Sequence, residues 1–83
     1  MNIRDAYQNL TAEAQDKART AIAAQLEAAG SAQNPEYIKQ VLLGIRHSPC
    51  GEEVARVISG YFRGYIGIDV SPEEVMAGKN GRG

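Results

Sequence analysis

The 83-residue sequence has little sulfur and few aromatic side chains. It contains one cysteine, no tryptophan and one phenylalanine. A single cysteine cannot form an internal disulfide, and low cysteine usage is typical of proteins kept in a reducing compartment. We therefore expect a cytoplasmic protein that is held together by packed side chains and not by covalent cross-links.

Long apolar runs are also missing. No stretch approaches the roughly 20 apolar residues that a membrane-spanning helix needs, so we expect no membrane partner. The segment MNIRDAYQNL has no apolar core of the kind found in secretion signals. The length predicts one small helical domain over residues 1–77. The glycine-rich segment 78–83 is expected to be a flexible tail.

An excess of positive charge is absent as well. Nine Lys and Arg residues against ten Asp and Glu residues give a net charge of −1, which argues against strong nonspecific binding to nucleic acid. The middle of the chain differs slightly, because residues 35–66 carry four cations and three anions besides the single histidine. Any DNA binding must therefore depend on where individual cations are placed.

Catalytic and metal-binding patterns are weak. Cys50 and His47 suggest a nucleophile–base pair or one corner of a metal site, but zinc needs about four ligands and a cysteine nucleophile needs an orienting third group. The pairs Glu52–Glu53 and Glu73–Glu74 stand at expected helix starts, where they favour the helix dipole. No phosphate-binding G-x-x-x-x-G-K-[ST] loop is present. We predict no enzymatic activity, no metal and no cofactor.

Apolar spacing predicts an all-α fold of four to five short helices. The first is expected over residues 2–9. Thr11 is a suitable N-cap for a long helix to about Ala29, with an apolar stripe formed by Leu10, Ala14, Ala18, Ala21, Ile22, Leu26 and Ala29.

The second half of the chain predicts two further helices beyond residue 50. One starts near Gly51 or Glu52 and carries Val54, Val57, Ile58, Tyr61 and Phe62 on its apolar side. Its end is open, because glycines lower helix propensity and residues 65–68 can instead form a short extended segment. The Ser71–Glu74 sequence is a capping box that predicts a short last helix through about Met76.

Between these segments, Gln33–Ser48 predicts a short capped helix followed by a basic loop. Asn34 is a good N-cap, Pro35 suits the first helical position, and Gly44 can end the helix in a left-handed conformation. The residues spaced to form a buried face are Ile38, Val41, Leu42 and Ile45. The opposite face carries Glu36, Lys39, Gln40 and Leu43. A helix with a packed back, a polar front and cations after its end suits reading of a DNA duplex.

This segment resembles the recognition helix of the lambda-type phage repressor and Cro helix-turn-helix family. The resemblance lies in the spacing of Ile38, Val41, Gly44, Arg46 and Pro49. It extends to Ala21–Leu26 as the first helix of the motif, to Val54–Phe62 as a following core helix, and to the sequence IDVSPEEV as a turn into a last helix. The resemblance implies a lambda repressor-like helix-turn-helix fold and a repressor from a phage or another mobile element.

The predicted contacts to DNA follow from this placement. Lys39 and Gln40 are expected to face base edges, whereas Arg46 and His47 are expected to hold phosphates. Gln33 and Asn34 lie at a helix N-terminus, which attracts phosphate, although simple capping explains Asn34 as well. The full predicted set is Gln33, Asn34, Glu36, Lys39, Gln40, Leu43, Arg46 and His47. The alternative interpretation is an ordinary solvated helix face.

The aromatic side chains concentrate in the segment GYFRGYIG. Aromatic residues with arginine are enriched in protein interfaces, and they can also stack on single-stranded bases. The alternative is that this segment completes the core. We expect Phe62 in the core and a homodimer interface formed by Tyr61, Arg63, Tyr65 and Ile66.

Together these patterns predict a dimeric, sequence-specific regulator that binds double-stranded DNA. The competing hypothesis is a small phage-type helical protein that binds and inhibits a host protein without contacting DNA. In that case the apolar surface around Tyr61–Ile66 would make the contact.

Overall fold

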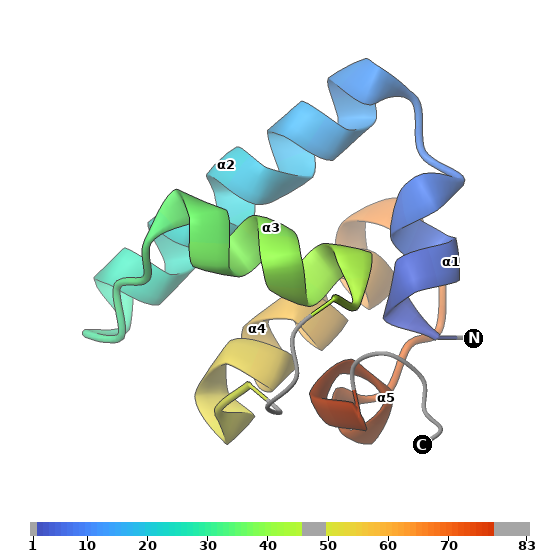
Figure 1. Ribbon diagram of the computed structural model, residues 1–83. Coiled ribbons are helices and arrows are strands. Elements are labelled where there is room, and N and C mark those ends of the chain that lie inside the picture. The colour runs from blue at the N-terminus through green and yellow to red at the C-terminus, as the bar shows by residue number, and fades with distance from the viewer. Residues whose placement is uncertain (1, 46–49, 78–83) are drawn as a thin grey trace.

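The computed structural model describes residues 2–45 and 50–77, and all the regular secondary structure within them is helical (Figure 1). The prediction of an all-α fold is confirmed. The elements, in chain order, are α1 (Ile3–Gln8), α2 (Ala12–Ala28), α3 (Pro35–Leu43), α4 (Glu52–Tyr61), the π-helical turn η1 (Phe62–Ile66) and α5 (Pro72–Ala77). The expected flexible tail, residues 78–83, lies outside the described residues.

Side-chain caps fix where the helices begin. Asn2, Thr11 and Asn34 each accept a hydrogen bond from a backbone N–H two or three residues further along the chain. At α5 the predicted capping box is present. The Ser71 hydroxyl accepts from the Glu74 N–H at 3.2 Å, and the Glu74 carboxylate accepts from the Ser71 N–H at 2.9 Å. These bonds satisfy N–H groups that have no partner inside the helix.

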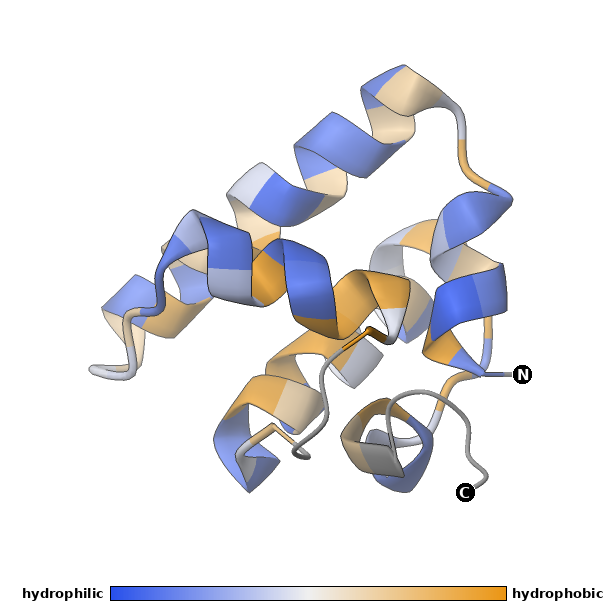
Figure 2. Cartoon of the chain, viewed as in Figure 1, coloured by the Kyte–Doolittle hydropathy of each residue, from blue (hydrophilic) through white to orange (hydrophobic). Residues whose placement is uncertain are grey.

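The helices enclose one apolar core. α2 is the longest, α3 packs against both α1 and α2, and α4 packs against α2 and α5 (Figure 1). The more hydrophobic stretches of α3 and α4 face each other across the interior (Figure 2). The largest fully buried side chains come from all parts of the described chain: Ile3, Tyr7, Ile22, Leu26, Ile38, Leu42, Ile58, Phe62, Val70 and Val75.

The buried stripe of α2 is narrower than the sequence predicts. Ala18, Ile22 and Leu26 are buried, whereas Leu10 is only partly buried and Ala29 is exposed. Ala29 is the C-cap of the helix and already lies beyond the part that other helices cover. The long helix therefore contributes one thin line of contacts to the core.

Ile45 is a clear correction to the predicted apolar face of α3. Its side chain is 56% exposed, although the 3.6-residue register predicts burial. Gly44 adopts φ +69°, which ends the helix as predicted, and its N–H bonds to the Val41 carbonyl at 3.1 Å. Because the chain leaves the helical path at Gly44, the register of α3 does not extend to Ile45.

The extended alternative for residues 65–68 is also wrong in part, since α4 continues directly into η1. The N–H groups of Gly67 and Ile68 both donate to the Phe62 carbonyl, at 2.7 and 3.0 Å, and Gly67 adopts φ +86°. Further on, the buried Ser59 hydroxyl donates to the Val70 carbonyl at 2.6 Å. Tertiary packing thus determines this turn, with Phe62 held in the core.

Candidate nucleic-acid interface

The back of α3 is closed into the core. Ile38, Val41 and Leu42 are 1%, 3% and 0% exposed, and the elements that α3 packs on are α1 and α2. The Asn34 carboxamide oxygen accepts the Glu36 N–H at 2.7 Å, so this side chain caps the helix. The burial of this face fixes the rotation of α3 about its axis, and so determines which side chains face solvent.

The front of α3 is formed by Glu36 and Lys39, both of which are exposed. Gln33 and Gln40 are half-buried, so they reach the surface less fully than the predicted reading face requires. Leu43 is a correction, because it is partly buried and packs against the core. It sits at the last helical position, where the surface curves back toward the interior.

The predicted phosphate contacts, Arg46 and His47, lie outside the described residues. The last described residue before them is the exposed Ile45. The proposed cationic end of this surface therefore remains an expectation from the sequence.

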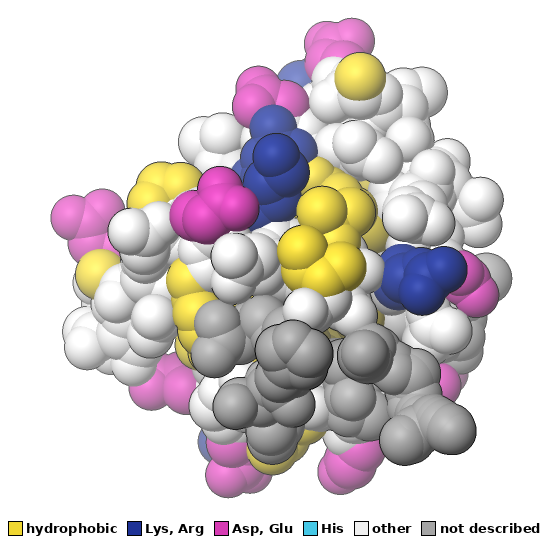
Figure 3. Space-filling view, in the orientation of Figure 1, with side chains coloured by type: hydrophobic (Ala, Val, Ile, Leu, Met, Phe, Trp, Pro, Cys, Tyr) yellow, Lys and Arg dark blue, Asp and Glu magenta, His cyan; other side chains and the backbone are white. Residues whose placement is uncertain are grey.

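The described front of α3 is close to electrically neutral, because the exposed charges Glu36 and Lys39 offset each other. In the face shown in Figure 3, dark-blue and magenta side chains alternate and apolar side chains lie between them. No continuous positive stripe is visible on that face among the described residues. Attraction to phosphate from this surface alone would be small.

A shallow groove of about 330 Å³ separates α3 from α2, and its walls are mainly apolar. Arg19 stands at its edge, where it donates to the Tyr7 hydroxyl at 2.5 Å and pairs with Asp16 at 3.1 Å. The hydrogen bond to Tyr7 raises the pKa of Arg19 above its usual value. The Arg19 guanidinium therefore links α2 to α1 by a hydrogen bond, and it is a weak candidate for a DNA contact.

The aromatic segment has some side chains exposed to solvent and others packed against the core. Tyr65 is 76% exposed and stacks on Tyr61, with ring centroids 5.2 Å apart. Arg63 is exposed and pairs with Asp69 at 3.5 Å. Tyr61 and Ile66, however, are partly buried against the core. Of the predicted dimer residues, only Tyr65 and Arg63 therefore extend fully into solvent.

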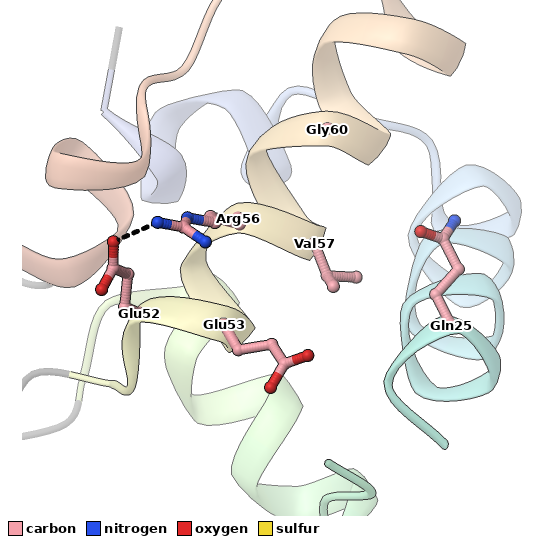
Figure 4. Close-up of a pocket in the computed structure, with 6 residues that line it drawn as sticks. All are labelled: Gln25, Glu52, Glu53, Arg56, Val57 and Gly60. Carbon is pink, nitrogen blue, oxygen red and sulfur yellow. Dashed lines mark hydrogen bonds and ion pairs between the residues drawn. The ribbon is translucent and has the colours of Figure 1, made fainter. Parts of the chain in front are cut away.

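A second groove, about 590 Å³ in volume, lies between α2 and α4 and was not foreseen from the sequence (Figure 4). Val57 and Gly60 line it from α4, and Gln25 lines it from α2. Its charged rim is formed by Glu52, Glu53 and Arg56, in which Arg56 pairs with Glu52 at 2.6 Å. The only sequence signal was Gly60, a glycine inside a predicted helix.

The remaining sites have structural explanations. Cys50 is 5% exposed and belongs to the core. Among residues 2–45 and 50–77, no three His, Cys, Asp or Glu side chains lie close enough together to hold a metal ion. No helix in the described part of the chain has the length and apolar character needed to cross a bilayer.

Comparison of the chain with protein-family models, with curated proteins and with solved structures finds no match. The family resemblance of the α3 region therefore rests on the residues that carry it in this sequence.

Proposed function

We propose that the protein binds double-stranded DNA sequence-specifically through α3 and acts as a dimeric transcriptional regulator in the cytoplasm, of the type found as repressors in phages and mobile elements. The observation that carries the proposal is the two-sided character of α3. Its back is anchored by Ile38, Val41 and Leu42, while Glu36 and Lys39 stand free on the other side. A short, rigidly held helix of this kind fits the width of a major groove.

In this proposal α2 and α3 form the helix-turn-helix pair. The connection between them, residues 29–34, is longer than the usual three- to four-residue turn. Near its start, the Ser31 N–H donates to the Leu26 carbonyl at 2.8 Å and the Ser31 hydroxyl donates to Glu53 at 2.5 Å. At its end, the Asn34 carboxamide oxygen accepts the Glu36 N–H at 2.7 Å. These bonds support a fixed position of α3 against α2.

The hydrogen-bonding groups on the exposed side of α3 indicate which bases each side chain would contact. Lys39 suits the guanine O6 and N7 acceptors, Gln40 suits adenine N6 and N7, and Glu36 can accept from the cytosine amino group. Because the described front is nearly neutral, one copy gains little attraction to phosphate. Two copies on successive major-groove faces, roughly 34 Å apart, would double both the base reading and the phosphate contacts.

The test is selection of bound sequences from random duplexes, followed by affinity measurements on the selected site. Lys39→Ala and Gln40→Ala should each cost roughly 1–3 kcal/mol and relax the preference at one base pair. Arg46→Ala should weaken binding to all sequences alike and flatten the salt dependence by about one unit. Lys17→Ala is the matched control, since Lys17 is 74% exposed on α2 and pairs with Glu13 away from α3. Unchanged binding in all three α3-region variants would exclude this surface as the reader.

The second candidate function is binding and inhibition of a host protein. The specific observation in its favour is Tyr65, a large aromatic side chain that is 76% exposed on a chain whose net charge is only −1. Aromatic side chains dominate the energy of many protein interfaces. Under this hypothesis no duplex would be enriched by the selection, and Tyr65→Glu would abolish capture of the partner while leaving the fold intact.

A further inference from the structure

α4 buries one face and leaves the opposite face without a covering helix in the described part of the chain. Val54, Ala55 and Ile58 are buried. On the other side, Glu53, Arg56 and Gly60 are exposed and Val57 is half-buried. This solvent face borders the groove between α2 and α4 (Figure 4).

Gly60, near the C-terminal end of this face, has no packing explanation among the described residues of one copy. A glycine inside a helix costs roughly 0.5–1 kcal/mol relative to alanine. A Cβ atom built at Gly60 would meet nothing within 4 Å, and the same is true at Gly64 in η1. Intramolecular packing therefore does not require either glycine. Their effect is to keep the backbone of α4 and η1 open to close approach from outside.

We propose that a second copy of this chain docks on the solvent face of α4, antiparallel to it, about a twofold axis midway between Val57 and Gly60. In this arrangement Val57 of each copy lies over Gly60 of the other, so that a side chain fills the space that the glycine leaves open. A twofold contact requires such self-complementarity, because each residue meets its counterpart twice. This contact would be the interface of the dimer in the proposed function. Only the biological role of the dimer rests on that proposed function.

Charge complementarity favours a second copy over an unrelated partner. The antiparallel register brings Glu53 of one copy to Gly64 of the other, beside Arg63. It also brings Arg56 against the ring of Tyr61, where a guanidinium is favoured. Arg56 and Arg63 already pair with Glu52 and Asp69, but these exposed pairs are weak and can be shared or exchanged. The same surface thus carries both the acid and the base that a twofold contact needs.

The size of the surface determines how strong a dimer can be expected. A standard interface takes roughly 800 Å² from each partner, whereas the whole chain exposes 4766 Å². α4 and η1 together comprise residues 52–66 and extend for roughly 22 Å at 1.5 Å per residue. With the adjoining side of α2, this is a small interface, so we expect a weak, reversible dimer that is detected only at high protein concentration.

The experiment is sedimentation equilibrium of the free protein over a wide concentration series, without DNA. Glu53→Arg and Arg63→Glu should each raise the dissociation constant of the dimer roughly tenfold or more, because like charges then face each other twice. The double variant should recover most of the wild-type affinity. Gly60→Leu should abolish the dimer without loss of helicity, since the new side chain enters open space in the monomer.

Matched controls separate the interface from other effects. Glu13→Arg and Lys17→Glu make the same charge changes on the exposed first half of α2. Ser31→Ala removes the hydrogen bond to Glu53 but leaves the charge of Glu53 in place. All three should dimerise like wild type. A wild-type protein that stays monomeric throughout would overturn the inference, as would dimerisation that Gly60→Leu and both charge reversals leave unchanged. Either result would leave the DNA proposal to its own test on α3.

Discussion

Introducing a carboxylate at Val41 tests whether the back of α3 is part of the core. Val41 is 3% exposed, so Val41→Asp forfeits roughly 1.5–3 kcal/mol of apolar burial. Placing a carboxyl group in that site without a designed partner adds roughly 1–3 kcal/mol. The total, about 2.5–6 kcal/mol, is a large part of the roughly 4–12 kcal/mol expected for 83 residues.

Ile45→Asp is the matched comparison, because the same apolar-to-acid change falls four residues later. Ile45 is 56% exposed, so the change should cost at most about 1 kcal/mol. Thermal and urea unfolding followed by far-ultraviolet circular dichroism would measure both variants. The thermal midpoint of Val41→Asp should fall by roughly 10 °C or more, at about 4 °C or more for each kcal/mol. An unchanged midpoint for Val41→Asp, or equal damage from Ile45→Asp, would show that the register and end of α3 are misplaced.

Three further comparisons of variants test other parts of the fold. Ser59→Ala leaves the Val70 carbonyl without its buried donor and should lower the free energy of unfolding, measured in urea, by about 1–3 kcal/mol. Ser31→Ala loses an exposed hydrogen bond and should change that free energy by about 0.5 kcal/mol or less. Equal effects would contradict the buried position of the Ser59–Val70 hydrogen bond. Gly44→Ala should destabilise by about 1–2 kcal/mol because φ is +69°, while Gly60→Ala should stabilise the monomer by about 0.5–1 kcal/mol, and the reverse order would refute both explanations. The hydrogen bond from the Ser71 N–H lowers the pKa of the Glu74 carboxyl. The stability that wild type gains over Glu74→Gln is therefore present at neutral pH, and it should fade as the pH drops below about 4.5 and through the folded-state pKa. A stability difference that grows in acid would contradict this sign.

Local chemistry made much of the fold predictable. The capping side chains Thr11, Asn34 and Ser71 are each confirmed, because an N-cap depends only on residues within one turn. The spacing of Ile38, Val41 and Leu42 is confirmed for the same reason, since one helical period determines which face is buried. Gly44 was correctly placed as the helix end.

The errors arise where local patterns meet tertiary structure. Ile45 was assigned to the buried face although the predicted helix end at Gly44 removes it from the helical register. The π-helical turn at Phe62–Ile66 depends on the burial of Phe62 and on the Ser59–Val70 hydrogen bond, which joins residues 11 positions apart. No periodicity in the sequence contains that information.

The candidate interface was predictable only in part. Glu36 and Lys39 are exposed as expected, whereas Leu43 turns back to the core. The groove beside α4 was invisible in the sequence, because Gln25 and Val57 are 32 positions apart and meet only when α2 packs on α4. Glycines in this segment lower helix propensity, but only the fold shows that a Cβ atom at Gly60 would meet nothing within 4 Å among the described residues.

Entry of α3 into the major groove can be tested by mapping the contact on isotope-labelled protein. Backbone amide signals would be followed by nuclear magnetic resonance during titration with the best duplex from the selection, beside a scrambled duplex of equal length and charge. Groove entry by α3 should make the selected duplex shift the signals of Glu36, Lys39 and Gln40 most strongly, whereas the scrambled duplex should not. Shifts confined to Tyr65 and its neighbours, or equal responses to both duplexes, would contradict it.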